Sequence, residues 1–304
     1  MNESGVAMDI DEALATFEAL RPELTGLAYR MCGSIADAED VIQEAWLRWH
    51  DVAHVTVRSP KAFLLRITMR LCLDRAKSAR NRREHYVGPW LPEPIVDMHQ
   101  VGRNPDPERI AELTDDLSVA LLLVLERLSP LERAAFLLHD VFDLSFEEIA
   151  TTLERDPGAC RKLASRARRR VKEGRTANQV SPARAKAFIA EFHRALQAGD
   201  LASVSRMLAE DAMLIADGGG KKYAALNPIY GRDKIMRFLN GLVTKFGVPK
   251  AIKCISLNAH EGFLVTERDG EIQTWCLDWS QEGLVKAIYQ LRNPDKLRHI
   301  LHVL

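Results

Sequence analysis

Apolar residues recur at spacings of three and four through most of residues 10–80 and 107–173, and neither stretch alternates as a strand would. This spacing predicts amphipathic helices in both stretches. Between them, residues 86–107 contain repeated prolines and glycines, which prevent a continuous helix and favour an extended path. The pattern therefore predicts two helical regions joined by a linker.

Beyond a short polar stretch at residues 174–179 the pattern changes. Helical spacing covers residues 183–197 and 199–208, and strand-like runs follow at residues 211–217, 251–257, 262–267 and 272–278. The third region is therefore predicted to be an α+β domain. A length of 304 residues favours a multidomain chain. The predicted divisions are a first domain at 8–82, a linker at 83–112, a second domain at 113–175 and a third at 181–304.

Residues 145–172 carry the signals of two short helices separated by a tight turn. Ser145 and Glu148 form a capping-box pattern at the start of the first helix, and Asp156 with Pro157 supplies a cap for the second. The second helix has one apolar face, and its opposite face carries Arg161, Ser165, Arg168, Arg169 and Lys172. A short helix, a tight turn and a basic helix are typical of a helix-turn-helix that reads DNA.

The net charge of zero, from 42 basic and 42 acidic residues, conceals two segregated basic blocks. Residues 58–83 hold 9 basic residues and 1 acidic residue, and residues 161–175 hold 8 and 1. By contrast, residues 3–51 hold 3 basic and 11 acidic residues, and the charges after residue 181 are evenly mixed. The two basic blocks are consistent with binding to nucleic acid.

Two predicted helices precede the linker. From Ala38 onward the first has an apolar face, and the residues outside that face include Asp40, Gln43 and Glu44. The second helix, residues 60–79, presents Lys61, Arg66, Arg70 and Lys77 opposite its apolar positions. An acidic helix is thus followed by a basic one.

These helices resemble parts of a known family. Residues 37–46, 59–64 and 71–75 read DAEDVIQEAW, SPKAFL and LCLDR, and they resemble region 2 of bacterial extracytoplasmic-function (ECF) sigma factors. Residues 128–133, LSPLER, together with the helix-turn-helix resemble region 4 of the same family. The chain departs from the family at Arg70, where asparagine is usual. The resemblance implies two all-α sigma domains, a region 2 helical bundle and a region 4 helix-turn-helix.

The resemblance also implies a role for each surface. Asp40, Gln43 and Glu44 match positions that bind the clamp of core RNA polymerase. Residues 51–58 and the basic helix after them match the part that captures the −10 promoter element and the opened strand. The basic face of the helix-turn-helix matches the reader of the −35 element. The expected partners are bacterial core RNA polymerase and promoter DNA, and the expected function is that of a sigma factor that directs polymerase to specific promoters and helps to open them.

The third region resembles the SnoaL-like branch of the nuclear transport factor 2-like cone. Three segments, WLPEP at 90–94, DGGGK at 217–221 and NPDKL at 293–297, resemble signatures of a sigma group with this fused domain, often called ECF41 and including SigJ-type proteins. In that group the domain is thought to regulate in place of a separate anti-sigma protein, so we expect the first segment to dock against the other two. The candidate regulatory residues are Trp90, Leu91, Pro92, Asp217, Gly218, Gly219, Gly220, Lys221, Asn293, Pro294 and Asp295.

Two other functions fit parts of the sequence. A ligand-sensing transcription regulator would bind a small molecule in its third domain, but it would need neither a clamp-binding acidic helix nor a strand-melting basic helix. An enzyme of the ketosteroid isomerase type would use an aspartate or histidine in an apolar cone. Candidates by residue type are Asp217, His260, Asp278 and Trp275. No spacing among them forces an acid and a base together, so we expect the chain not to be an enzyme.

The remaining features suggest a cytoplasmic protein. No apolar run approaches the ~18 residues of a membrane span, and the first residues lack the features of a secretory signal. The five cysteines are scattered and form no CxxC pair, which favours reduced thiols. We therefore expect no metal and no bound cofactor, and an unidentified small-molecule or protein signal at the third domain.

Overall fold

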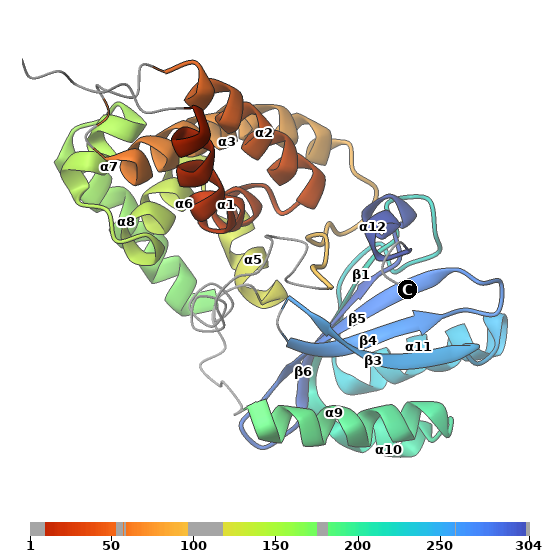
Figure 1. Cartoon of the computed structure of the whole chain (residues 1–304). Coiled ribbons are helices and arrows are strands. Elements are labelled where there is room, and N and C mark those ends of the chain that lie inside the picture. Colours follow the sequence, from red (N-terminus) through yellow and green to blue (C-terminus); the bar gives the residue numbers. More distant parts are fainter. Residues whose placement is uncertain are drawn as a thin grey trace, which may run out of the picture. The chain divides into compact units, whose positions relative to one another are not determined.

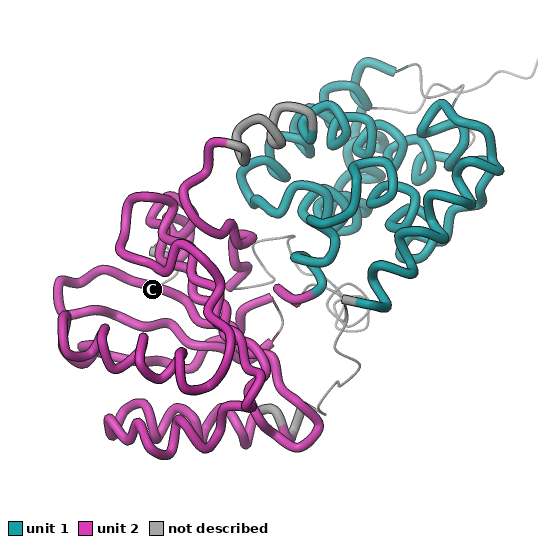
Figure 2. The backbone as a smooth tube through the Cα atoms, turned by 180° about the vertical axis from the view of Figure 1, so that it is seen from behind, with its two compact units in different colours: residues 1–82, 99–116, 121–175 teal, residues 83–98, 117–120, 176–304 magenta. Residues whose placement is uncertain are grey.

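The structure is a computed structural model that describes residues 10–52, 57, 59–96, 118–174, 182–258 and 260–301. It divides into two compact units (Figures 1 and 2). The first comprises residues 1–82, 99–116 and 121–175, and the second comprises residues 83–98, 117–120 and 176–304. The segment at 83–98, predicted as part of a separate linker, thus groups with the α+β region.

The first unit begins with three helices, α1 (Ile10–Cys32), α2 (Ile35–His50) and α3 (Pro60–Glu84). Gly33, at a φ of 67°, ends α1, and the Ser34 side chain accepts a hydrogen bond from the Asp37 backbone to start α2. The indole of Trp49 is fully buried and donates to the carbonyl of Ala13 at 2.9 Å, which ties α2 to α1. This is the helical bundle that the sequence predicts.

The helix-turn-helix lies in the same unit. The helices of this region are α5 (Val119–Glu126), α6 (Pro130–Phe136), η3 (Leu137–Val141), α7 (Phe146–Leu153) and α8 (Pro157–Gly174), and α7 and α8 form the helix-turn-helix. Both hydrogen bonds of the predicted capping box are present at Ser145 and Glu148, and Asp156 accepts from the backbone of Ala159 at 2.8 Å. The turn between α7 and α8 includes Glu154 in the left-handed region at a φ of 54°. The predicted start of each helix is therefore confirmed.

The second unit has a six-stranded sheet with helices packed against it. Its elements are α9 (Pro182–Gln197), α10 (Leu201–Met207), β1 (Leu208–Asp217), β2 (Ile229–Tyr230), α11 (Arg232–Phe246), β3 (Ala251–Leu257), β4 (His260–Thr266), β5 (Ile272–Trp279), β6 (Val285–Leu291), η4 (Pro294–Lys296) and α12 (Arg298–Leu301). The strand order is β2-β1-β6-β5-β4-β3, and only the β1–β6 pair is parallel among these strands. Helices α9, α10 and α11 lie on one side of the sheet (Figure 1). Phe192, Phe263 and Trp279 lie in the core between them.

The sequence predicts this unit only in part. The observed β3 has the predicted bounds, and β4 and β5 lie within two residues of theirs. The pattern did not single out α11 or β6. Strand β6 is buried along nearly all its length and so lacks the alternation of a half-exposed strand. None of the helices in the described part of the chain is long and apolar enough to cross a membrane.

Candidate functional site

Helix α2 presents its predicted acidic face to solvent. The side chains of Asp40 and Glu44 are 59% and 45% exposed, and Gln43 is exposed. Asp40 pairs with Arg75 of α3 at 3.2 Å, and Glu44 pairs with Arg48 one turn further along at 2.7 Å. Such exposed pairs contribute little to stability and exchange partners at little cost. The carboxylates are therefore accessible to a basic partner surface.

The basic helix α3 has its charged residues in varied surroundings. Lys61 pairs with Glu23 at 2.6 Å, and the guanidinium of Arg66 lies over the ring of Phe63 at 5.2 Å. The side chain of Lys77 and most of the predicted loop at 51–58 lie outside the described residues. The side chain of Arg70 bonds to residues of the helix-turn-helix.

The outward face of α8 is as predicted. Arg161, Ser165, Arg168, Arg169 and Lys172 are all exposed. Arg161 lies near Glu147 of α7 at 3.5 Å, and Arg168 bonds to Asp140 at 2.6 Å. The inward positions Cys160, Ala164 and Ala167 are fully buried. The helix therefore packs through small side chains and leaves its cations on the surface.

A buried carboxylate beneath α8 was not predicted. Glu132 caps α6 by accepting from the backbone and hydroxyl of Ser129, and it also accepts from Arg166 at 2.9 Å and Arg170 at 2.9 Å. Burial raises the pKa of Glu132, but the bonds from Ser129 and the arginines outweigh it, so the pKa lies below its usual range. Its presence in the LSPLER segment was visible in the sequence, but its arginine partners 34 and 38 residues away were not.

Two arginines join the helices of region 2 type to those of region 4 type within the first unit. Arg133, on α6, donates to the carbonyl of Met31 at 2.6 Å and to Glu126 at 2.9 Å. Burial lowers the pKa of Arg133 to about 10. Arg70 donates to the carbonyls of Thr151 and Thr152 and pairs with Glu154 at 2.9 Å. A residue predicted to contact DNA is thus engaged by the end of α7 in this arrangement.

In the second unit, Asp217 holds the segment that contains WLPEP. Asp217 is fully buried and accepts from the Tyr86 hydroxyl at 2.6 Å, the Leu91 backbone at 2.8 Å and Lys296 at 2.8 Å. Burial raises the pKa of Tyr86, and the hydrogen bond to Asp217 raises it further. Tyr86 donates from its side chain and Leu91 from its backbone, so the segment binds the Asp217 carboxylate through both.

Further contacts extend this attachment on both sides. Lys296 also donates to the Leu91 carbonyl at 2.6 Å, and its ammonium lies 4.1 Å from the centre of the Trp90 ring. At the far end, the Ile95 backbone N–H donates to the side-chain Oδ1 of Asn258 at 2.9 Å, and the Asn258 backbone N–H donates to the Ile95 carbonyl at 2.8 Å. We call the set Tyr86, Trp90, Leu91, Ile95, Asp217, Asn258, Asn293 and Lys296 the linker dock.

The glycines after Asp217 form a tight turn that lies against the linker segment and Asn293. Gly219 and Gly220 have φ angles of 57° and 70°, which disfavour any residue with a Cβ atom. A Cβ at Gly219 would also lie 2.3 Å from the Asn293 side chain, and one at Gly220 would lie 3.1 Å from Val87. The nearby Lys221 pairs with Asp295. The turn therefore brings the backbone close enough to receive the linker.

The candidate catalytic residues lie in different surroundings. Asp217 belongs to the linker dock, Trp275 lines a cavity, His260 is exposed at the start of β4, and Asp278 is half-buried on β5. Among the described residues, no three histidine, cysteine or acidic side chains gather as metal ligands would. No disulfide joins the five cysteines, all of which lie among the described residues; Cys254 is exposed and Cys276 partly buried, whereas the other three are buried.

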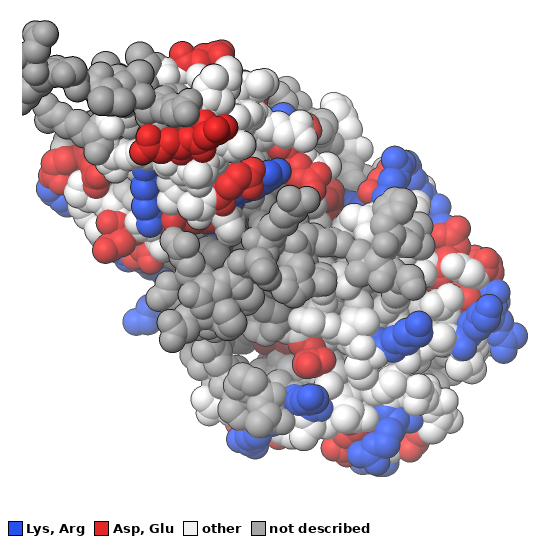
Figure 3. All heavy atoms as spheres, in the orientation of Figure 1, with Lys and Arg blue, Asp and Glu red and all other residues white. Residues whose placement is uncertain are grey.

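The charge pattern differs between the two units. On the face drawn in Figure 3, acidic side chains predominate over the first unit, whereas blue and red are intermixed on the second. The mixed surface agrees with the even charge distribution after residue 181.

Comparisons with known proteins agree with the geometry of the first unit. Residues 16–82 match the model of the Sigma-70 region 2 family, and residues 118–171 match the model of Sigma-70, region 4. The chain is 38% identical over 201 residues to the probable ECF RNA polymerase sigma factor SigI of Mycobacterium tuberculosis, with 65% of this chain and 67% of that protein covered.

A second relative matches nearly the full length of the chain. The chain is 41% identical over 293 residues to the ECF RNA polymerase sigma factor SigJ of Mycobacterium tuberculosis, with 93% of this chain and 92% of that protein covered. The fold of this chain is similar to the crystal structure of Mycobacterium tuberculosis SigJ, with a TM-score of 0.75 and 35% identity over 94% of this chain and 98% of that one. The predicted fold class, two helical sigma domains and an α+β domain, is confirmed. The chain therefore belongs to the extracytoplasmic-function RNA polymerase sigma factors.

Proposed function

We propose that this chain brings core RNA polymerase to promoters through two exposed faces and that its second unit controls when those faces are available. The acidic face of α2, with Asp40, Gln43 and Glu44, would bind a basic surface of the polymerase. Accessible carboxylates against a basic surface favour fast and specific association. The exposed pairs made by Asp40 and Glu44 can be exchanged for such a partner.

The basic residues of α3 and α8 would bind the promoter. On α8, Arg161 and Ser165 lie near the amino end, where a recognition helix meets base edges, and Arg168, Arg169 and Lys172 lie further along, where phosphates are contacted. On α3, Lys61, Arg66, Arg70 and Lys77 would bind the strand that is opened at the −10 element. Arg70 could do so only after leaving the end of α7.

The linker dock is the observation on which we base the regulatory part of the proposal. Residues 86–96 lie between α3 and α5, so they belong to the stretch that joins the two sigma domains. Docking fixes the path of these residues and removes the conformational freedom with which a tether adjusts its span. Attachment therefore restricts the arrangements in which the two sigma domains can contact both promoter elements at once.

In this proposal the docked segment and the contacts of Arg70 and Arg133 favour a resting arrangement, and polymerase binding or a signal favours release. Such a shift needs only a difference in affinity between the two states. The second unit would act by contact and not by catalysis, because Asp217 is occupied by Tyr86, Leu91 and Lys296.

Reconstituted transcription with purified core polymerase tests the proposal. We expect Trp90→Ala and Lys296→Met, which weaken the dock, to raise transcription at limiting protein, with the same −10 and −35 sequences recognised. Lys286→Met is the matched control, since it breaks the exposed pair with Asp211 in the same unit. Removing residues 181–304 should have the larger effect.

The outcome that would contradict regulation by the dock is transcription by Trp90→Ala and by the truncated chain that equals that of the full-length protein at every concentration. Unchanged transcription with all variants would leave sigma activity intact but would reopen a catalytic role for the second unit. Failure of the full-length chain and of the truncated chain to support any promoter-dependent transcription would contradict the proposed sigma activity itself.

A further inference from the structure

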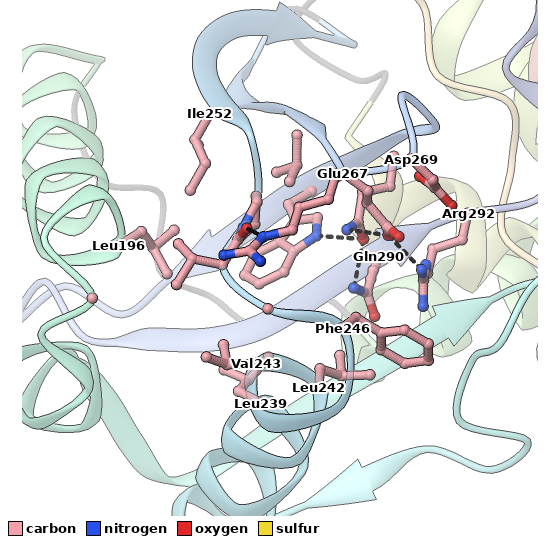
Figure 4. Close-up of a pocket in the computed structure, with 18 of the residues that line it drawn as sticks. Leu196, Leu239, Leu242, Val243, Phe246, Ile252, Glu267, Asp269, Gln290 and Arg292 are labelled. Carbon is pink, nitrogen blue, oxygen red and sulfur yellow. Dashed lines mark hydrogen bonds and ion pairs between the residues drawn. The ribbon is translucent and has the colours of Figure 1, made fainter.

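The second unit contains a cavity of about 290 Å³ between α11 and the sheet (Figure 4). Most of its wall is apolar, with Leu196, Leu239, Leu242, Val243, Phe246 and Ile252 among the lining residues. Its volume is near the lower end of the ~300–1,000 Å³ of small-molecule pockets. The cavity shares no residue with the linker dock.

A chain of hydrogen bonds forms the polar end of the cavity. The indole of Trp275 donates to Gln273 Oε1 at 2.9 Å, and Gln290 Nε2 donates to the same oxygen at 2.6 Å. Gln273 Nε2 in turn donates to Glu267 at 2.9 Å, and Arg292 pairs with Glu267. The partly buried carboxylate of Glu267 is therefore neutralised by Arg292 within this chain of bonds.

These bonds fix the orientation of both amides. Trp275 can only donate and the Glu267 carboxylate can only accept, so the Gln273 oxygen must face Trp275 and its nitrogen must face Glu267. The oxygen of Gln273 then requires a donor from Gln290, which turns the Gln290 nitrogen toward it and the Gln290 oxygen away. The atom of the Gln290 amide that faces away from Gln273 is therefore its oxygen, which can only accept a hydrogen bond.

The Gln290 oxygen is left without a donor. Gln290 is fully buried, and its Oε1 accepts no hydrogen bond from any residue that the structure describes. Figure 4 shows its side chain pointing from β6 toward Leu242 and Phe246 of α11, which line the other side of the cavity. An unsatisfied buried carbonyl is costly and uncommon in folded proteins. The apolar wall opposite offers a water few further partners.

We propose that this cavity binds a small, uncharged, mostly apolar molecule with one hydroxyl or N–H group that donates to Gln290 Oε1. The apolar wall would cover the hydrocarbon part, and the fixed amide would select the donor. A charged ligand is disfavoured at this end, because Glu267 and Arg292 already neutralise each other. The volume suits a molecule of one or two rings.

A matched pair of probes tests the chemistry on the full-length chain. We expect 2-naphthol, which carries a donor, to bind at least about tenfold more tightly by isothermal titration calorimetry than 2-methoxynaphthalene, which carries none, because the second probe leaves the buried acceptor unpaired. Gln290→Leu should abolish this preference by removing the acceptor. Leu242→Trp, which fills the cavity from α11, should abolish the binding of both probes.

Circular dichroism shows whether each variant is folded, and Leu242→Trp decides the location of the site if Gln290→Leu does not fold. Absence of binding by 2-naphthol, equal affinity for the two probes, or full binding by Leu242→Trp would each overturn the proposal. None of these results bears on promoter-dependent transcription, so failure here leaves the proposed function untouched.

Discussion

Asp217 and Glu132 are buried carboxylates that bind basic partners within their own units, and those partners differ in exposure. Asp217 in the second unit is fully buried, and its partner Lys296 is only 8% exposed, so both charges of the pair lie away from water. Glu132 in the first unit is also buried, but its partners Arg166 and Arg170 are 51% and 46% exposed. One cluster encloses both of its ions, whereas the other encloses only the acid.

The difference teaches how one chain can combine a firm attachment with adaptable cations. Loss of one partner from a buried pair leaves an uncompensated buried charge, which is strongly destabilising. Half-exposed arginines, by contrast, lose little when they change partners, because water and salt compensate. The linker dock is therefore suited to holding a segment. Arg166 and Arg170 of α8 are suited to exchanging Glu132 for DNA phosphates.

The largest effect is expected from Asp217→Asn. The substitution keeps the shape but leaves Lys296 buried without its counter-charge, so the free energy of unfolding of the second unit should fall by about 3–5 kcal/mol. Hydrogen exchange of β1 and β6 would measure the loss. Asp211→Asn, which breaks the exposed pair with Lys286, should change the same quantity by less than about 1 kcal/mol. Similar losses of unfolding free energy in the two variants would show that burial does not decide how much each ion pair stabilises the unit.

The next effect concerns the exposed acids of α2. Changing both Asp40 and Glu44 to lysine should weaken binding to core polymerase by about tenfold or more, since like charges would face each other. A titration of holoenzyme formation would measure it. Glu210→Lys combined with Glu282→Lys gives the same charge change on exposed acids of the second unit and should have little effect. Equal affinities for both double variants would count against the assigned face.

The two groups of arginines on α8 should behave differently from each other. Arg161→Ala should alter the preferred −35 sequence at a cost of about 1–3 kcal/mol on that sequence. Arg169→Ala should weaken binding to all sequences and reduce the dependence on salt by about one phosphate contact. Binding to a set of −35 variants at several salt concentrations would separate these effects. Identical, sequence-independent losses would argue against base reading by this helix.

The smallest effect is expected from Glu132→Gln. The pKa of Glu132 is lowered in the folded state, so its contribution to stability is present above the unfolded pKa of about 4.3 and is lost as the pH falls through the folded value. The variant should therefore be less stable by about 1 kcal/mol at pH 7, and the difference should shrink below about pH 4. Chemical denaturation at both pH values would measure it. A difference that stays constant with pH would mean that the charge of Glu132 is not the cause.

Local signals in the sequence carried much of the fold and some of the site. The capping box at Ser145, the cap at Asp156 and the exposed basic face of α8 depend on neighbouring residues, so their pattern predicts them. The WLPEP segment and its receiving loops were likewise indicated by their resemblance to a known sigma group. Strand β6 and its contributions to the cavity were not indicated, because burial on both faces removes the alternation that marks a strand.

The sequence by itself determined where the helices begin, which faces carry charge, and which family the chain resembles, because each of these depends on residues close together or on a shared motif. Only the tertiary structure decided that Lys296 pairs with Asp217 across 79 positions, that Glu132 lies beneath the arginines of α8, and that no residue in the described part of the chain donates to the Gln290 oxygen. These outcomes depend on which side chains packing brings together and which hydrogen bonds remain after every neighbour has been paired. A one-dimensional pattern does not contain that information.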